Sequence, residues 1–273
     1  MPKLNLLEPI VLSGKFNSQN DSISATGRIP SLKYLDYKIT NAQFNLATEN
    51  NALNYKLVID DVDSPQLKLF QTELSGTVEN DVIAYQFQID DFKDEPHYRV
   101  AGIMKAQGNV TEFSLDPDAL LLNYESWNIP QNNSIKISEK GIWAGNFELS
   151  HNQSAIRINS QTAEPDSPLN VNFNNFEIET ISSMISKDTL LAGGKINGDV
   201  ILKNLKTTPQ FTSDLTIDDF NFKKDTLGNI RMLVDNQTAN TLNANINITG
   251  KGNNVNLIGL YNCLLYTSPS PRD

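Results

Sequence analysis

Apolar and polar residues alternate one by one along much of the chain, most regularly toward its end. Within residues 241–249 every second residue is apolar: Leu242, Ala244, Ile246 and Ile248. A period of two is typical of a β-strand with one apolar and one polar face, because successive side chains point to opposite sides. Turn-forming glycine and asparagine dominate residues 250–254, and the alternation resumes at Val255 and Leu257. These two runs predict a β-hairpin whose apolar residues share one face.

The same alternation recurs in earlier parts of the chain and predicts a fold made almost entirely of strands. It is clearest at residues 23–29, 53–59, 83–89 and 211–217. The alternation slips by one residue at Asp218–Asp219, which predicts a β-bulge there. In total we expect about 16 strands joined by short turns. The one helix that we expect is short, with Thr180 as its cap and Ile181, Met184 and Ile185 on one face.

The chain shows no internal boundary between domains. No long stretch rich in proline, glycine or serine interrupts the succession of strands. A β-sandwich usually closes after about 100 residues, so two sandwiches would leave a visible boundary. We therefore predict one all-β domain over residues 1–262. Its architecture is expected to be an elongated, curled, mostly antiparallel sheet with an apolar interior and at most one short helix.

The charge of the chain narrows the choice of partners. The sequence has 32 acidic residues against 22 lysines and arginines, which gives a net charge of −10. Binding to nucleic acid depends on clustered cations that displace counterions, so we expect no nucleic-acid partner. No uninterrupted apolar stretch approaches the roughly 18 residues of a membrane-spanning helix, and no signal peptide is visible at the start.

Residues that carry catalytic or metal chemistry are few and scattered. His97 and His151 lack metal-ligand spacing, and the acidic clusters at 60–63 and 90–95 lack the rest of a calcium-binding loop. The sequence contains none of the common nucleophile or nucleotide-binding motifs. We therefore expect neither enzymatic activity nor a metal or other cofactor. Trp127 and Trp143 are suited to stacking against a sugar, although tryptophan is more often buried within a sheet.

The last residues of the chain differ in character from the rest. Residues 263–273 read CLLYTSPSPRD and resemble the translation of a sequencing adapter. We treat this segment as an artefact and expect it to make few contacts with the sheet. The single cysteine, Cys263, belongs to the segment, so disulfide and thiolate chemistry are excluded from the remainder. We expect the natural protein to continue beyond Asn262.

Four short motifs in residues 190–262 suggest a family. They are G-x-(I/L)-N-G at 194–198, P-x-F-x-(A/S)-D-L-x-I at 209–217, D-x-L-G-x-(I/L) at 225–230 and G-x-G-N-x-V-x-L-x-G-x-Y at 250–261. In this order they resemble the TamB family (translocation and assembly module subunit TamB) in its Bacteroidota form. Residues 121–135, 146–150 and 175–186 are also similar to that family, so the resemblance covers at least half of the chain.

The resemblance implies a role in the cell envelope. TamB proteins are long, are anchored in the inner membrane and cross the periplasm, and their sheet folds like a taco around an apolar groove. They are thought to pass phospholipid between the inner and outer membranes, and some work with an outer-membrane barrel assembly protein. The implied ligands here are phospholipid acyl chains. The residues expected to line the groove are Leu215, Ile217, Leu242, Ala244, Ile246, Ile248, Val255 and Leu257.

Two other functions remain compatible with the residues. The first is a structural or adhesive surface protein whose strands close into β-sandwiches that bind no lipid. The second is a carbohydrate-active module built around Trp127 and Trp143. An open groove on the apolar faces would favour the lipid conduit, whereas a second sheet packed over those faces would favour the sandwich.

Overall fold

A computed structural model describes residues 4–6, 8–65, 67–185, 192–223, 225–236 and 241–262. The segment 263–273, for which we expect few contacts, lies outside the described residues. Strands make up 73% of the described residues, their pairing is mostly antiparallel, and the described part holds one short helix. The predicted all-β class is therefore confirmed.

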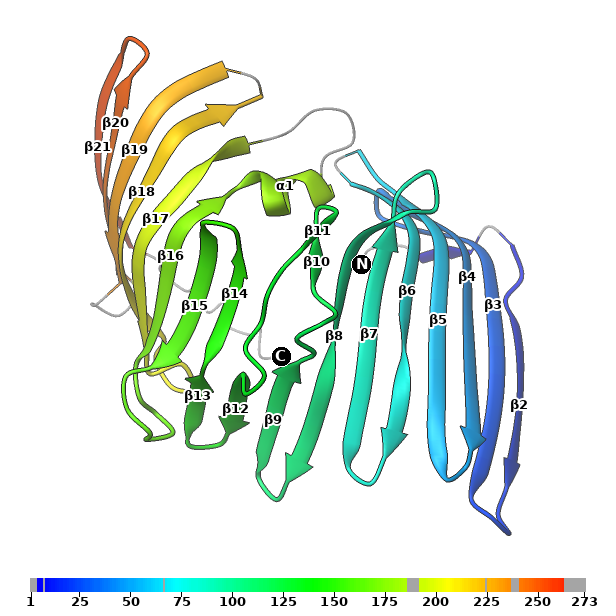
Figure 1. Ribbon diagram of the computed structural model, residues 1–273. Helices are drawn as coiled ribbons and strands as arrows, with labels where there is room; N and C mark the ends of the chain where they lie inside the picture. Colours follow the sequence, from blue (N-terminus) through cyan, green and yellow to red (C-terminus); the bar gives the residue numbers. More distant parts are fainter. Residues whose placement is uncertain are drawn as a thin grey trace, which may run out of the picture.

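The first part of the chain forms a 13-stranded sheet (Figure 1). Its strands are β1 (Leu4–Leu6), β2 (Val11–Asn17), β3 (Ser22–Tyr34), β4 (Tyr37–Glu49), β5 (Ala52–Asp63), β6 (Lys68–Glu79), β7 (Val82–Asp90), β8 (Pro96–Gln107), β9 (Val110–Leu115), β10 (Leu121–Leu122), β11 (Glu125–Ser126), β12 (Ser134–Ser138) and β13 (Gly141–Gly145). Most neighbours in the sequence are also neighbours in the sheet, because short turns join them as hairpins. The small β10–β11 hairpin branches off this path and pairs with β8.

The second part forms an eight-stranded sheet in strict sequence order. Its strands are β14 (Phe147–His151), β15 (Ser154–Ser160), β16 (Leu169–Glu177), β17 (Ala192–Lys203), β18 (Gln210–Phe222), β19 (Asp225–Asp235), β20 (Thr241–Gly250) and β21 (Asn253–Asn262). The predicted hairpin at the end of the chain is β20–β21. The pairing of β18 with β19 shifts between Ile217 and Phe220, which confirms the bulge predicted at Asp218–Asp219.

The division into two sheets corrects the prediction of one continuous sheet with about 16 strands. Asn146 has a left-handed φ of 49°, so the chain turns there, and pairing switches from β12 to β15. Side chains replace the lost backbone pairing: the N–H of Ala144 donates to Ser160 Oγ at 3.0 Å, and the N–H of Asn146 to Asn159 Oδ1 at 3.0 Å. The extra strands are mostly the short ones between β9 and β15, whose alternation is too brief to recognise.

The segment between β9 and β12, residues 116–133, fills the corner between the two sheets; we call it the seam segment. Its residues Leu120, Trp127 and Ile129 are buried together with Phe176 of β16. Val100 and Leu115 of the first sheet pack on this cluster, and so do four residues of the second: Leu149, Ile156, Phe173 and Ile196. An antiparallel bridge between Asn128 and Ser150 also ties the segment to β14. The two sheets therefore share one core.

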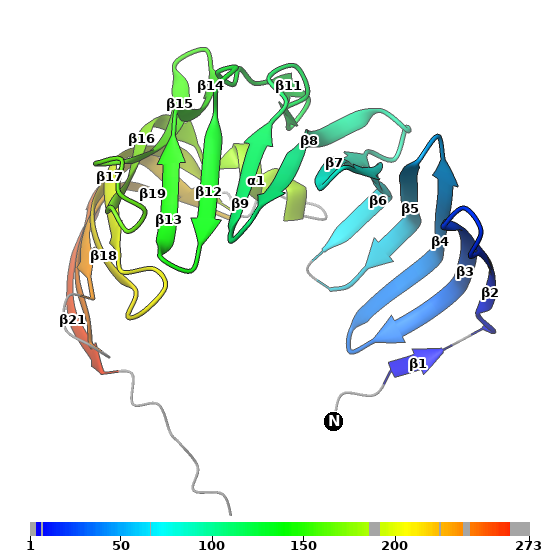
Figure 2. The ribbon, with the colours of Figure 1, turned by 90° about the horizontal axis from the view of Figure 1, so that it is seen from below.

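Seen from below, the two sheets form an arch that is open on one side (Figure 2). The helix α1 (Glu179–Ile185) lies inside it, and Tyr98 of β8 holds it there through hydrogen bonds to Thr180 O (3.2 Å) and Ser183 Oγ (2.6 Å). We call the face of each sheet that turns toward the seam cluster and α1 the inner face. It carries the apolar residues of the alternating pattern.

The short helix was predicted at the right place, but the predicted cap was wrong. The N–H of Ser182 donates to Ile178 O at 2.9 Å, so Thr180 lies within the first turn and is not the cap. The side chain of Ile181 is 51% exposed, whereas Thr180 and Ser182 are buried. The polar side of this turn faces the protein because its hydroxyl groups form hydrogen bonds with nearby backbone groups. The Ser182 hydroxyl, for example, donates to Ala192 O at 2.7 Å. The side chains of Met184 and Ile185 lie outside the described part.

Two glycines on the inner face lie beneath tyrosine side chains. Tyr55 pairs with Gly76, and its hydroxyl donates a hydrogen bond to Ala84 O at 3.0 Å. Tyr85 pairs with Gly102 in the same way, and its hydroxyl oxygen lies 2.8 Å from where a Cβ of Gly102 would be. A Cβ at Gly102 would also collide with the carbonyl oxygen of Ser114. The absent side chains therefore let the aromatic rings lie flat along the sheet.

We expect the substitution Gly102→Val to lower the free energy of unfolding by about 2–3 kcal/mol, because the strand would have to shift away from β9. Gly259→Val on β21 is the matched control, since a Cβ there meets nothing within 4 Å. Its effect should stay within about 0.5 kcal/mol. Chemical denaturation of both variants measures the difference. Equal losses would show that close packing at Gly102 is not what requires glycine.

Candidate functional site: the inner apolar face

Apolar side chains form continuous rows across the second sheet, because paired residues of antiparallel strands share a face. One row contains, in order, Leu149, Ile156, Phe173, Gly198, Leu215, Met232, Ile246 and Leu257. The next contains Phe176, Ile196, Ile217, Ile230, Ile248 and Val255. Each row crosses from the seam cluster to the last strand with no charged residue.

The structure brings the predicted groove residues together on this face. Leu215, Ile246 and Leu257 share the first row, and Ile217, Ile248 and Val255 share the second. Ala244 pairs with Val234 and with Gly259, and Leu242 pairs with Tyr261.

Sequence reasoning missed the strand that connects these residues. In β19, between β18 and β20, the inner-face residues are Ile230, Met232 and Val234. They alternate with Arg231 and Leu233, so a period-two signal was present. Leu233 on the opposite face made that signal less distinct than the asparagine pattern of β20.

The first sheet continues the apolar surface. One row contains Leu12, Gly27, Phe44, Leu57, Leu74, Phe87 and Val100. Another contains Leu53, Val78, Ile83, Met104, Phe113, Ile135 and Ala144. Val100 packs on the seam cluster, as Leu149 and Ile156 of the second sheet do, so the two apolar faces meet at the seam.

Much of this surface is only partly covered by protein. Among the described residues no large side chain is fully buried. Ile217 and Ile230 are 7% and 8% exposed, but at the ends of the arch Leu12 is 67% exposed and Leu257 is 53% exposed. Asn245 and Asn247, on the polar face of β20, are half-buried like Ile246. The two faces of β20 therefore differ in polarity more than in exposure.

Three tyrosine hydroxyls on the inner face are partly shielded from water. Burial raises the pKa of the Tyr55, Tyr85 and Tyr98 hydroxyls above the ordinary value. The nearby Tyr55 adds to the effect on the pKa of Tyr85, and a hydrogen bond with Ser183 partly offsets it at Tyr98. These three sites therefore disfavour the charged phenolate form.

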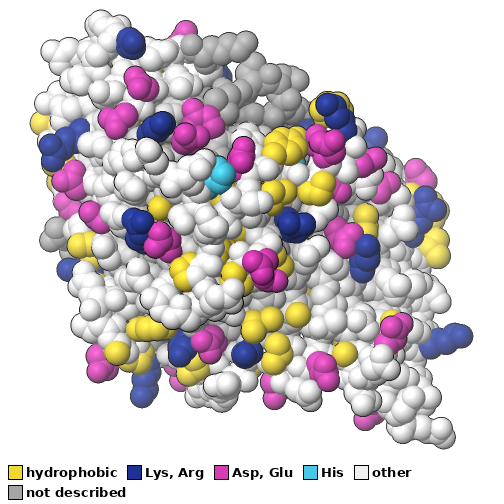
Figure 3. All heavy atoms as spheres, viewed as in Figure 1, with side chains coloured by type: hydrophobic (Ala, Val, Ile, Leu, Met, Phe, Trp, Pro, Cys, Tyr) yellow, Lys and Arg dark blue, Asp and Glu magenta, His cyan; other side chains and the backbone are white. Residues whose placement is uncertain are grey.

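Polar and charged side chains gather on the opposite face. Lys56 pairs with Glu73 at 2.8 Å in the first sheet, and Arg157 pairs with Glu148 at 2.9 Å in the second. Figure 3 shows charged groups of both signs scattered over the surface in that view, with no large patch of one sign. Such exposed pairs contribute little to stability but keep this face in water.

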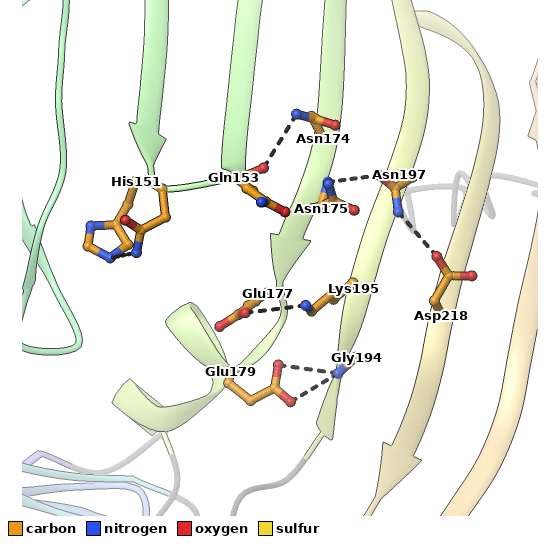
Figure 4. A network of polar contacts seen from close by, with 11 residues as sticks. His151, Gln153, Asn174, Asn175, Glu177, Glu179, Gly194, Lys195, Asn197 and Asp218 are labelled. Atoms are coloured by element: carbon orange, nitrogen blue, oxygen red, sulfur yellow. Dashed lines mark hydrogen bonds and ion pairs between the residues drawn. The ribbon is translucent and has the colours of Figure 1, made fainter.

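A polar hollow of about 620 Å³ lies where the β14–β15 turn, the end of β16, the start of α1 and the β10–β11 hairpin converge. Figure 4 shows three of its charged groups engaged: Glu177 pairs with Lys195 at 3.9 Å, and Glu179 accepts the backbone N–H of Gly194 at 3.1 Å. Among the described residues no three histidines, cysteines or acidic residues are placed to hold a metal ion.

The two tryptophans do not form one site. Trp127 is 4% exposed, within the seam cluster and at the edge of the polar hollow. Trp143 pairs with Lys136 and lines a different pocket of about 330 Å³; its Nε1–H donates to Thr162 O at 3.2 Å. A sugar could not stack on the face of Trp127 without opening the core, so this geometry does not favour the carbohydrate hypothesis.

No known protein family, curated protein or solved structure matches this chain. In the described part of the chain, no helix has the length and apolar character needed to cross a membrane.

Proposed function

We propose that the chain is a section of a hydrophobic groove that carries phospholipid acyl chains between the inner and outer membranes of a cell envelope. The observation that carries the proposal is the uncharged inner face, whose apolar rows cross both sheets while remaining partly open. In a closed sandwich a second sheet would cover such rows. Here the two sheets meet at the seam, and their far ends are free of each other (Figure 2).

The physical task fits this surface. Each buried CH₂ group of an acyl chain gains about 0.8 kcal/mol on leaving water, so a lipid tail needs an unbroken apolar path. The main path of the first sheet has ten strands and the second sheet has eight. At about 4.8 Å per strand, the apolar rows extend roughly 85 Å along the arch. A passive conduit needs no catalytic residue, cofactor or selective pocket.

The resemblance to the TamB family extends the proposal to a cellular setting. The four motifs fall on β17 to β21, where the inner-face rows are most regular. By analogy, the full-length protein would be anchored in the inner membrane, cross the periplasm and contribute to outer-membrane biogenesis with a barrel assembly protein.

Site-specific photo-crosslinking tests the proposal. A photo-reactive amino acid at Ile246, on the inner face, should capture phospholipid when the chain is illuminated with lipid vesicles. The same amino acid at Asn245 should capture little, because neighbouring residues of a strand point to opposite faces. Mass spectrometry of the products identifies the lipid. Equal capture at both positions, or none at Ile246, would contradict the groove.

A further inference from the structure

Both histidines of the chain contact the same small hairpin, one from each sheet. The sequence holds two histidines in all, His97 in β8 and His151 at the end of β14. His97 contacts Asn123, and His151 contacts Ser126. Asn123 lies in the turn of the β10–β11 hairpin and Ser126 at its open end, and the hairpin belongs to the seam segment. An imidazole side chain is thus placed on each side of the junction.

On the side of the second sheet, the geometry fixes the role of each ring nitrogen of His151. Nδ1 lies 2.8 Å from the carbonyl oxygen of Ser126, which can only accept, so Nδ1 carries a proton. Nε2 lies 2.7 Å from the side-chain nitrogen of Asn152 and therefore accepts in the neutral ring. Glu125 Oε2, on the hairpin, is 3.6 Å from the same Nε2. A second proton would go on Nε2, so Asn152 would have to turn its amide oxygen toward the ring, and the approach of Glu125 would become an ion pair with the hairpin.

On the side of the first sheet, His97 lies among aromatic rings. Its ring stacks on Tyr124 of the hairpin with centroids 4.1 Å apart, and it lies 4.2 Å from Tyr98. Nε2 is 2.9 Å from Asn123 Oδ1 and can donate to it in either charge state. A cationic ring would gain from the faces of both tyrosines.

The hairpin adopts a strained conformation that these contacts help to hold. Asn123 and Tyr124 both have left-handed φ values, 53° and 67°, which are costly for a bulky residue such as tyrosine. The N–H of Tyr124 donates to His97 O at 3.0 Å, and its hydroxyl donates to Asp91 Oδ2 at 2.9 Å. A strained backbone of this kind persists only where several surrounding contacts hold it in place.

We propose that the β10–β11 hairpin is a pH-responsive clasp between the two sheets, which tightens when His97 and His151 become protonated. The inference does not depend on lipid binding, because it concerns the junction and not the groove. Its physical basis is that each protonation adds an attraction between the hairpin and one sheet without removing a backbone hydrogen bond.

Tyr124 and Asp91, two other ionisable groups at the junction, keep one charge state near neutral pH. Burial raises the pKa of Tyr124 to about 12, and its bond to Asp91 adds to this, so it stays a donor near neutral pH. Burial acts to raise the pKa of Asp91, but hydrogen bonds from the N–H groups of Glu95 and Lys93 and from Tyr124 outweigh it, and the net shift is downward. Asp91 therefore stays ionised. The other charged groups around the junction are Lys93, Glu95 and Arg99 on the side of His97, where Arg99 Nε donates to Ala119 O at 3.4 Å, and Glu125, Glu177, Glu179 and Lys195 on the side of His151.

Hydrogen exchange of the intact chain at about pH 7.5 and about pH 5.5 tests the clasp. The informative amides are those of Trp127 and Asn128, which donate to Leu120 O and Ser150 O. After correction for intrinsic exchange rates, their protection should rise about threefold to tenfold on acidification, the range expected for two partly exposed attractions. Amides of β18 and β19 should not change.

Two variants separate the clasp from a general effect of acid. In His97→Gln/His151→Gln, glutamine still forms hydrogen bonds but cannot become charged, so the rise should disappear. Glu125→Gln alters a side chain that is 64% exposed and should reduce the rise while leaving the contribution of His97. If the double variant does not fold, Glu125→Gln alone tests the proposal. No rise in the wild-type chain, or an undiminished rise in either variant, would overturn the proposal.

Discussion

The substitution Trp127→Ala should lower the free energy of unfolding by about 3–5 kcal/mol, the usual cost of removing a buried tryptophan. Trp127 is 4% exposed and lies 5.8 Å from the ring of Phe176, with inner-face residues of both sheets packed on their cluster. Its loss would leave a cavity where the sheets are joined. We therefore expect both sheets to lose stability together, although Trp127 lies in no strand of either sheet.

The control for this substitution is Trp143→Ala. Trp143 is only partly buried, on the outer face, and its loss removes one hydrogen bond and the contact with Lys136, whose Nζ lies 5.3 Å from the ring. A cost of about 1–2 kcal/mol is expected. Denaturant titration followed by circular dichroism measures both variants. Equal costs, or independent unfolding of one sheet in Trp127→Ala, would contradict a shared core.

The substitution Ile246→Asp should reduce phospholipid retention about tenfold or more, because a lipid tail would have to displace water from a carboxylate. The matched control, Asn245→Asp, places the same charge on the opposite face of the same strand. It also keeps the oxygen that accepts the side-chain N–H of Asn247 at 3.1 Å. Its lipid retention should remain close to that of the unmodified chain. Extraction of bound lipid after vesicle incubation gives the comparison.

Stability distinguishes loss of the groove from loss of the fold. Ile246 is half-buried, so water can reach an aspartate there, and we expect a stability cost of only about 1–2 kcal/mol. Ile217, in the second row, is 7% exposed, and Ile217→Asp should cost about 3–5 kcal/mol because the charge would be buried without a partner. If Ile246→Asp unfolds the chain as severely as Ile217→Asp, the inner face is a closed core and the groove hypothesis fails.

The sequence was most informative where one physical signal dominates. Alternation between apolar residues and asparagine predicted β20 and β21, their pairing and the face on which Ile246 and Leu257 lie. The bulge at Asp218–Asp219 was also predictable, because an inserted residue shifts the phase of the apolar–polar alternation. These features depend on neighbours in the chain, which the sequence displays directly.

The seam could not be predicted in the same way. Its cluster joins Leu120, Trp127 and Phe176 across long sequence separations, and the strands around it have as few as two residues. The break at Asn146 depends on one left-handed residue, and asparagine is common in this chain. Tertiary packing therefore decides the structure here, and local pattern does not.

The change of pairing at Asn146 also determines how the arch responds to force. Within each sheet, neighbouring strands are joined by long ladders of backbone hydrogen bonds, which resist bending cooperatively. Across the line between β13 and β15, the two bonds to Ser160 Oγ and Asn159 Oδ1 end on side chains that can rotate. Mechanical compliance is therefore greatest along this line, while the bridge between Asn128 and Ser150 and the packing of the seam cluster limit how far the two sheets can swing relative to each other.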